Sequence, residues 1–586
     1  MPERITFTIE IDGQAVSTEL QLSSVVVNRE LNRIPSARLV IVDGETNIGD
    51  FEVSNQDTFI PGKELVVKAG DSGNDEQIFK GVITSHRIKV RVGGQSQLMI
   101  EARDVAFKMT LNPRNALFEE TTDSDLIEEI LGNYSDINPE IEATSATNLR
   151  MVQHKATDWD FVLARARANG KLLFINDGEL KVATPRVNES PAMTLTYGVD
   201  VMELDLEMDA RFQAKGLKTK SWAHGDQEIV EAEAAEPDSP EQGNLDAETL
   251  AEVAGEQEVE LYDSGQADET ALQAWADARL YWQRLARLRG HIRLEGTAAI
   301  LPGMSLELAG CGERFNGNAF VSGIRHELYD GGWTLDAAIG LPENLFPHAT
   351  GISMPTELLP AIAGLHVGKV LQLQDDPDGA ERILVHIPMI TPDGSGLWSR
   401  WASVDAGNNR GFVWRPEIDD EVVVGFLGGD PRSPVVLGGL HSSANPAPIE
   451  AADDNFEKGY VSKSEMRFHF DDDKKIITIE TPGGHQLILD EDDSSIRIVE
   501  LNGNTTTMNA DGVTMDSPGD FVLTCTGNAS IEAGGNIELT ASGDLTATGT
   551  NITAEASANA TISGSAGAEL SSGGQTKVEG SLVMIN

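Results

Sequence analysis

Histidines, cysteines and clustered carboxylates are the residues of this chain whose chemistry suits catalysis or metal binding. The eleven histidines form no H-E-x-x-H pair, and no Cys/His cluster has zinc spacing. The chain also lacks a G-x-S-x-G elbow and a G-x-x-x-x-G-K-[ST] phosphate loop. We therefore predict no catalytic residue, no metal site and no cofactor.

Three acidic groups remain as candidates for acid–base chemistry or Ca²⁺ binding. His326, Glu327 and Asp330 lie in a strand-like segment, which favours the surface of a strand over a site. The runs 419–421 and 471–473 fall between apolar strand patterns, so we interpret both as turns.

The elements that organise the chain lie in its last third, where a Gly or Asn returns every eight residues: Gly519, Gly527, Gly535, Gly543, Asn551, Asn559 and Gly567. The first four are followed by Asp or Asn, a pair suited to tight turns. Between these corners apolar residues alternate with Thr, Ser and Glu. The pattern predicts strands of about six residues with one buried face.

One such ribbon has too little apolar surface to fold alone, because a repeat buries its face only against neighbours. Three ribbons closed around one axis give every strand a partner, so we predict an intertwined trimeric β-helix. The inward positions change from odd to even numbers after Thr550, which we interpret as one corner variation. A Gly/Ser/Thr linker would have a similar composition, but it needs neither the eight-residue step nor the alternation.

The length and net charge of the chain limit its domain organisation and its possible binding partners. With 586 residues it should contain several domains, and 44 Lys+Arg against 94 Asp+Glu give a net charge of −50. Such a surface repels phosphate backbones and anionic lipids, so nucleic-acid binding and stable membrane association are not expected. The only cysteines are Cys311 and Cys525, and the start lacks a signal peptide, so we expect synthesis in the cytoplasm and no disulfide framework.

Composition shifts divide the chain into seven segments. We expect a first barrel at 1–110, a helix-containing segment at 111–227, an acidic surface loop at 228–262, a helix and second barrel at 263–354, an OB-fold at 355–445, a linker and the start of the needle at 446–518, and the octad-repeat β-helix at 519–586. Helices are predicted at 123–133, 157–169 and 268–289, with Gly290 ending the last one. Prolines 355 and 360 mark a hinge before the OB-fold.

The two predicted barrels share an internal similarity. The segment that starts at Pro61-Gly62 resembles the one that starts at Pro302-Gly303, and Ile83 aligns with Val321. Two related barrels in each of three chains give six similar modules around one axis. Such a body could seat on a sixfold ring.

The segment Gly411-Phe-Val-Trp-Arg-Pro416-Glu-Ile-Asp-Asp-Glu421-Val-Val-Val-Gly-Phe-Leu-Gly-Gly429-Asp-Pro-Arg-Ser-Pro434-Val-Val-Leu-Gly438 resembles the signature of the VgrG and phage-baseplate spike family. The resemblance implies a mainly β chain with two hub β-barrels and inserted helices (the hub, 1–354), an OB-fold barrel (the collar, 355–445) and a C-terminal intertwined trimeric β-helix (the needle, 519–586).

From this resemblance we expect a homotrimeric spike of a contractile injection system that docks on a hexameric inner tube protein, contacts baseplate proteins and pierces a target envelope. A PAAR-like tip protein should cover Leu582, Val583, Met584, Ile585 and Asn586. Export on contraction, to the extracellular space or a target cell, follows from the same resemblance. A spike-borne hydrolase and a β-helical glycan-binding adhesin are the alternatives. The short chain without an appended effector favours a phage-tail-like particle over a type VI apparatus.

Overall fold

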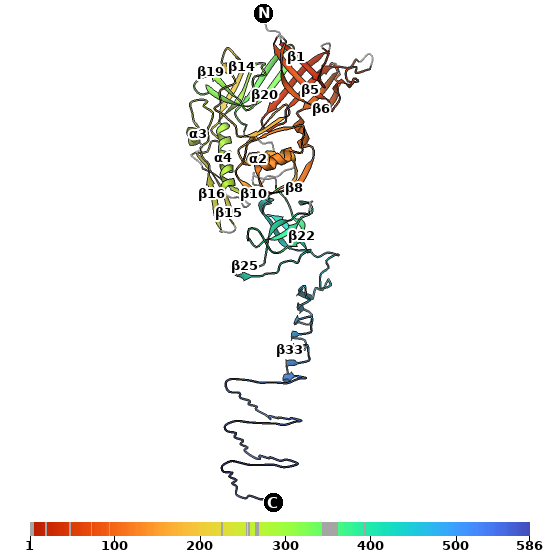
Figure 1. The fold of residues 1–586 in the computed structure, drawn as a ribbon, viewed down its shortest axis with the longest axis vertical. Helices are drawn as coiled ribbons and strands as arrows, with labels where there is room; N and C mark the ends of the chain where they lie inside the picture. Colours follow the sequence, from red (N-terminus) through yellow and green to blue (C-terminus); the bar gives the residue numbers. More distant parts are fainter. Residues whose placement is uncertain are drawn as a thin grey trace. The chain divides into compact units, whose positions relative to one another are not determined.

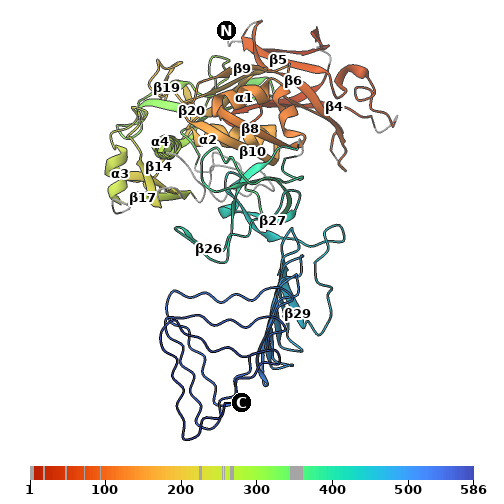
Figure 2. The same cartoon turned by 60° about the horizontal axis from the view of Figure 1, so that its bottom comes forward.

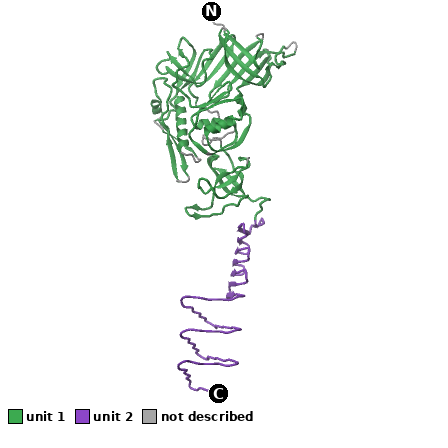
Figure 3. Cartoon of the chain, viewed as in Figure 1, with its two compact units in different colours: residues 1–447 green, residues 448–586 purple. Residues whose placement is uncertain are grey.

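The structure of the chain is a computed structural model that describes residues 5–585 except 18–19, 46–48, 72, 93, 224–226, 254, 256–257, 264–268, 343–360 and 392–393. Strands dominate it, which confirms a mainly β protein (Figure 1). The chain forms two compact units, residues 1–447 and 448–586 (Figure 3). The predicted hinge at prolines 355 and 360 lies outside the described residues.

One sheet of 13 strands forms the largest part of unit 1. Its strands from the first part of the hub are β1 (Ile5–Ile11), β2 (Gln14–Ala15), β3 (Leu22–Glu30), β4 (Ser36–Val42), β5 (Glu64–Asp71), β6 (Asn74–Lys89) and β7 (Gln97–Arg103). Those from the second part are β13 (Thr194–Thr196), β14 (Val201–Met208), β18 (Leu288–Glu295), β19 (Ser305–Ala309), β20 (Gly317–Tyr329) and β21 (Gly332–Ile339). Strand β3 pairs with β20, and this seam joins the two parts.

The sheet surrounds two apolar cores. The first contains Leu39 and Ile100 from its own strands, together with Leu328 and Trp333 from β20 and β21. The second is built around residues such as Ile292 of β18. The two predicted barrels are therefore two parts of one sheet, each with its own core, and the seam contributes residues to the first core.

The internal similarity is visible in the backbone hydrogen bonds. The N–H of Gly62 donates to the carbonyl of Ile83 at 2.9 Å, and the N–H of Gly303 donates to the carbonyl of Val321 at 2.7 Å. A β-bulge follows directly after Ile83 in the β6–β7 ladder and directly after Val321 in the β20–β21 ladder. Both glycines have a positive φ, of 102° and 93°. The aligned segments thus have the same local structure.

A smaller subdomain lies between the two parts of the hub sheet in the sequence. Its strands are β8 (Pro113–Thr122), β9 (Asn138–Ile141), β10 (Thr147–Thr157), β11 (Leu172–Asn176) and β12 (Glu179–Ala183), and its helices are α1 (Asp123–Leu131) and α2 (Asp158–Ala168). Thr157 caps α2 by accepting from the N–H of Asp160 and donating its hydroxyl to the Asp160 carboxylate, as the sequence predicts. Gly170 follows with φ of 67°.

The acidic segment 228–262, predicted as a surface loop, is folded, and that prediction is wrong. It contributes β16 (Glu228–Glu233), α3 (Ala247–Val253) and β17 (Glu258–Asp263), and both strands flank β15 (Gly216–Ala223). Lys218 and Lys220 on β15 pair with Glu258 and Glu260 on β17, so part of the acidic charge is neutralised across the sheet. The other face of this sheet packs against Leu272 and Trp275 of α4 (Glu269–Leu285).

Helix α4 ends four residues earlier than the predicted 268–289, because Leu288 already belongs to β18. Gly290 is therefore not a helix terminator. A Cβ on Gly290 would lie 2.0 Å from the carbonyl oxygen of Asp205 on β14. The glycine permits close approach of two strands in this ladder.

The collar contains a closed five-stranded barrel, which confirms the OB-like prediction for this region. Its strands are β22 (His366–Gln372), β23 (Ile383–His386), β24 (Leu397–Trp401), β27 (Glu421–Phe426) and β28 (Pro434–Gly439), and a hairpin of β25 (Ala406–Gly407) and β26 (Arg410–Gly411) extends from it. Three short 3₁₀ helices complete unit 1, at Asp57–Phe59, Val105–Thr110 and Leu427–Gly429.

Unit 2 begins with an antiparallel meander of seven strands, each five residues long. They are β29 (Glu457–Val461), β30 (Arg467–Asp471), β31 (Ile476–Glu480), β32 (Gln486–Asp490), β33 (Ser495–Val499), β34 (Thr505–Asn509) and β35 (Gly512–Asp516). The segment 446–518, predicted as a linker and the start of the needle, thus contains a regular β meander between Glu457 and Asp516. The run 471–473 falls at the β30–β31 turn, as predicted.

The repeated Pro-Gly turn provides a matched test of packing. A Cβ on Gly303 would lie 2.5 Å from the Phe174 ring, whereas a Cβ on Gly62 would meet nothing within 4 Å. Both substitutions to Ala carry the cost of a positive φ, about 1–2 kcal/mol. We expect Gly303→Ala to destabilise the hub by about 1–3 kcal/mol more than Gly62→Ala, from overpacking. Urea unfolding followed by tryptophan fluorescence measures this, and equal losses would contradict the packing at Phe174.

Candidate assembly surfaces

The needle shows the predicted corners in its backbone. Bends fall at 518–519, 526–527, 534–535 and 542–543, in steps of eight residues. The next bend is at residue 550, and the series then continues at 557–558, 565–566, 573–574 and 581–582. The corner therefore moves back by one residue near Thr550, where the apolar register changes from odd to even positions. Figure 2 shows this part of the chain as wide, open turns.

The apolar side chains of the needle have no core within this chain. Every described residue from 518 to 585 is exposed, and none belongs to a strand. Leu539 is 71% exposed and Ile562 is 92% exposed. Other exposed apolar side chains in the predicted inward register are Phe521, Leu523, Ile531, Ile537, Leu545, Ile552 and Leu570. An extended chain with this pattern requires strand partners that the described residues do not supply.

The meander β29–β35 has the same property to a smaller degree. It is a single layer, and apolar side chains such as Phe468, Ile479, Leu489 and Ile498 are each at least 40% exposed. A sheet with one uncovered apolar face is stable only when a second layer covers it. Both parts of unit 2 therefore present apolar surface for assembly.

The predicted tip residues lie at the end of the described chain. Leu582, Val583, Met584 and Ile585 are all exposed, and Asn586 lies outside the described residues. Together they form a short apolar run that is not covered by other described residues.

The signature motif of the collar builds a buried ionic cluster. Gly428 and Gly429 turn the chain with positive φ angles between β27 and β28, and Asp430 and Arg432 follow. The Arg432 guanidinium pairs with Asp430 at 2.6 Å and with Asp263 of β17 at 3.0 Å. Burial alone would lower the pKa of Arg432, but the two fully buried carboxylates raise it above its usual value. The cluster ties the collar to the folded acidic segment of the hub.

A second contact between hub and collar is mainly apolar. Val152 of β10 belongs to the same core as the collar barrel residues. The ring of His154 lies 6.0 Å from that of His366 at the start of β22, in an edge-on arrangement. Burial lowers the pKa of His154 to about 4, and the nearby Lys155 and His366 act in the same direction. His154 is thus neutral at pH 7 and serves packing.

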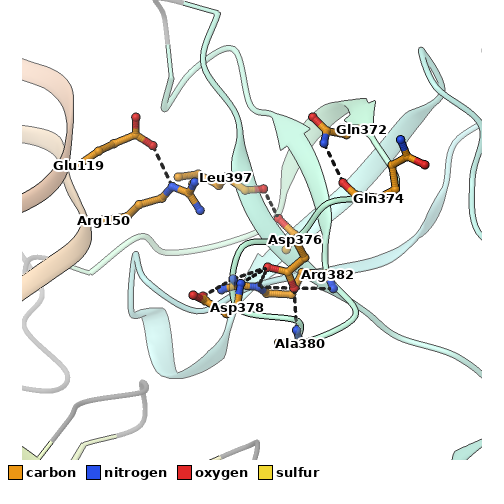
Figure 4. A network of polar contacts seen from close by, with 10 residues as sticks. Glu119, Arg150, Gln372, Gln374, Asp376, Asp378, Ala380, Arg382 and Leu397 are labelled. Carbon is orange, nitrogen blue, oxygen red and sulfur yellow. Dashed lines mark hydrogen bonds and ion pairs between the residues drawn. The ribbon is translucent and has the colours of Figure 1, made fainter.

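The loop between β22 and β23 is fixed by one carboxylate (Figure 4). Asp376 accepts from the N–H groups of Asp378, Ala380 and Arg382 and from the Arg382 guanidinium at 2.6 Å. Burial alone would raise the pKa of Asp376, but these donors lower it to about 2. A separate ion pair in the same view joins Arg150 to Glu119 on the hub. The Asp376 contacts thus fix the conformation of this collar loop.

The acidic candidates from the sequence do not come together. His326 is 2% exposed and accepts a hydrogen bond from Trp333 Nε1 at 3.3 Å, so the prediction of a strand-surface position is wrong for this residue. It shares the core-facing side of β20 with Ile324 and Leu328 because side chains alternate along a strand. Burial lowers its pKa to about 3, and Arg29 acts in the same direction. Asp330 lies in the turn that follows.

Two further observations concern the described residues only. They contain no group of three or more His, Cys, Asp or Glu that could hold a metal ion. No helix among them is long and apolar enough to cross a membrane.

Two family profiles match the chain. One, described as the Alg8 N-terminal domain, matches residues 2–330, and the other, described as the type VI secretion system/phage-baseplate injector OB domain, matches residues 366–441. The second contains the collar barrel and its signature. The chain belongs to the VgrG and phage-baseplate spike family, with an Alg8-type N-terminal domain.

Individual members of the spike family are distant from this chain. The type VI secretion system spike protein VgrG1b of Pseudomonas aeruginosa is 30% identical over 122 residues, which are 19% of this chain and 16% of that protein. VgrG4b of the same organism is 45% identical over 58 residues, 10% of this chain and 7% of that protein. A chain in the structure of the half-lidded Francisella PdpA-VgrG complex has a TM-score of 0.51 at 10% identity, covering 88% of both chains. This likeness concerns the fold alone.

Substitution of Arg432 tests whether the buried ionic cluster holds the collar to the hub. Arg432→Met removes the buried cation that the carboxylates of Asp430 and Asp263 share, which costs about 3–5 kcal/mol. We expect faster amide hydrogen exchange in β17, β27 and β28. The matched control is Arg410→Met, which removes the exposed pair with Asp405 and costs about 0–1 kcal/mol. Equal exchange in the two variants would show that the cluster does not hold the collar.

Proposed function

We propose that this chain is one of three copies in a spike of a contractile injection system. The hub docks on a hexameric inner tube, the collar follows the hub along the threefold axis of the trimer, and the needle pierces the target envelope. The observation that carries the proposal is the needle itself: its apolar residues alternate in register with an eight-residue corner, and all of them are exposed in one chain. Three intertwined copies would bury that face on a common axis.

The hub supports the same arrangement through its repeat. The Pro-Gly turn, its hydrogen bonds and its bulge occur twice per chain. Three copies would present six similar modules, which suits a ring of six tube subunits. Contacts with baseplate proteins would use the remaining hub surface.

In a trimer, the run Leu582, Val583, Met584 and Ile585 would form a blunt apolar surface, and Asn586 follows it in the sequence. Unpaired strand ends of this kind need a cover. A cone-shaped tip protein of the PAAR kind fits this role.

A lysine placed on the inward face tests the needle. Leu539→Lys would place three charges in a narrow apolar core, and each buried charge costs several kcal/mol. The neighbouring Thr540→Lys adds the same charge on the outward face, where substitutions change stability by about 0.5 kcal/mol or less. We expect only Leu539→Lys to lower strongly the temperature at which the chains separate in detergent, as seen on unboiled gels. Equal effects would contradict the assigned register.

The tip is tested by a change that leaves the octads intact. Val583→Glu with Ile585→Glu places six carboxylates at the end of a trimer, and desolvating them against an apolar cover is unfavourable. We expect the tip protein to be lost from the purified particle while the chains stay associated. Ser581→Glu is the control, and retention of the tip protein by the double variant would contradict the assigned contact.

A further inference from the structure

Two stretches of the hub sheet have an unpaired side among the described strands. Strand β14 is the last strand at one end and pairs only with β18. Strand β6 lies inside the sheet, which continues through β5 and β1 to β2, but it is long: its first half, Asn74–Val82, pairs with β5, and its second half pairs with β7 on the opposite side. The β5 side of residues 85–89 is therefore open. Open edges present unpaired N–H and C=O groups to a partner.

These two edges have counterparts inside the same chain. The ladder of β3 with β4 has a bulge after Leu22, and the ladder of β14 with β18 has a bulge after Val201. Strands β4 and β18 in turn pair with β7 and β21. Strand β14 thus corresponds to β3, with a numbering difference of 201 − 22 = 179. Strand β6 corresponds to β20, because a bulge follows Ile83 in one and Val321 in the other. Their residue numbers therefore differ by 321 − 83 = 238.

The counterparts are paired with each other. Strand β3 joins β20 in an antiparallel ladder that places Asn28 opposite Arg325, Val26 opposite Glu327 and Ser24 opposite Tyr329. We propose that β14 of one copy pairs with β6 of the next copy in this same register, and this inference rests on the trimeric spike proposed above. The two numbering differences then fix every pair. The outward pairs are Glu207 with Arg87, Asp205 with Lys89 and Glu203 with Arg91.

The chemistry of these pairs supports the register independently of the repeat. Each outward pair joins an acidic residue to a basic one, whereas the three corresponding pairs inside the chain contain no ion pair. The alternate, core-facing pairs are Leu206 with Ile88 and Leu204 with Val90, both apolar. Ile88 is 49% exposed and Val90 is 61% exposed in the single chain. Both leucines already pack against the second hub core.

The basic residues at the end of β6 and just after it are also unusual in this acidic protein. Arg87, Lys89 and Arg91 make no ion pair with any described residue, although the chain has 94 acidic residues. On β14, Glu207 and Glu203 each pair with an arginine of β18. The proposed seam would add a second cation to each of them and supply one to Asp205. Opposite charges that face each other across neighbouring strands stabilise the pairing of those strands.

The register is strongly specified. A slip of one residue would place Lys89 opposite a leucine and Ile88 opposite a carboxylate, because the side-chain period of a strand is two. The contact is heterologous, with β14 of each copy on β6 of the next, and in the proposed trimer three such contacts form a closed ring. Three seams between copies would then alternate with three seams within copies around the hub.

Cysteine pairs in the full-length chain test this seam. In a background with Cys311→Ala and Cys525→Ala, the variant Lys89→Cys with Asp205→Cys places two cysteines directly opposite each other. The control, Arg87→Cys with Glu203→Cys, removes the same charges but offsets the cysteines by four residues, about 13 Å, beyond the reach of a disulfide. After mild oxidation we expect most of the first variant to run as a covalent trimer on non-reducing gels, and the control to remain single chains.

The possible outcomes distinguish a failure of the proposed strand pairing from a failure of the proposed trimeric spike. Light scattering of both variants before oxidation establishes whether they are trimeric. Trimers that fail to cross-link, or that cross-link equally in both variants, would overturn the seam and leave the trimeric spike standing. A monomeric mass in the cysteine-free background would overturn both. Charge exchange gives a second readout: Lys89→Asp should lower the temperature of trimer dissociation, and adding Asp205→Lys, but not Glu203→Lys, should restore it.

Discussion

The structure depends on one constraint, which is that the needle segments between corners cannot bury their own apolar faces. Their predicted inward side chains are exposed throughout the described needle. Hydrophobic burial contributes about 25 cal/mol per Å², so leaving this surface in water would forfeit the main favourable term of folding. In the spike that we propose, the remaining domains bring three such chains together in register.

Assembly of this kind works against the charge of −50 on every chain. Like charge opposes association through long-range repulsion, which salt screens over about 8–10 Å. Contacts must therefore be local and complementary. The folded acidic segment illustrates this inside the chain, where lysines of β15 pair with glutamates of β17. The Arg432 cluster does the same between collar and hub.

Features that rest on local periodicity were predicted well from the sequence. The octad corners, the cap at Thr157 and the five-stranded collar barrel all follow from turn residues and alternation close together in the chain. Features that depend on distant partners were not. The alternation of Val230 and Ala232 in the acidic segment is typical of a strand, but the acidic composition of the segment favours a loop. The strand is stabilised by pairing with β15 and by packing against α4, and neither contact can be predicted from the segment itself. The sequence predicts a surface position for His326, whereas its hydrogen-bond donor Trp333 lies on the next strand and the residue is buried.

The most direct test of the central claim is the mass of the full-length chain in solution. Light scattering at moderate salt and micromolar concentration should give three chains, 3 × 63.0 = 189 kDa, because the needle and meander bury their apolar faces only between copies. A stable, folded species of 63.0 kDa under these conditions would contradict the account.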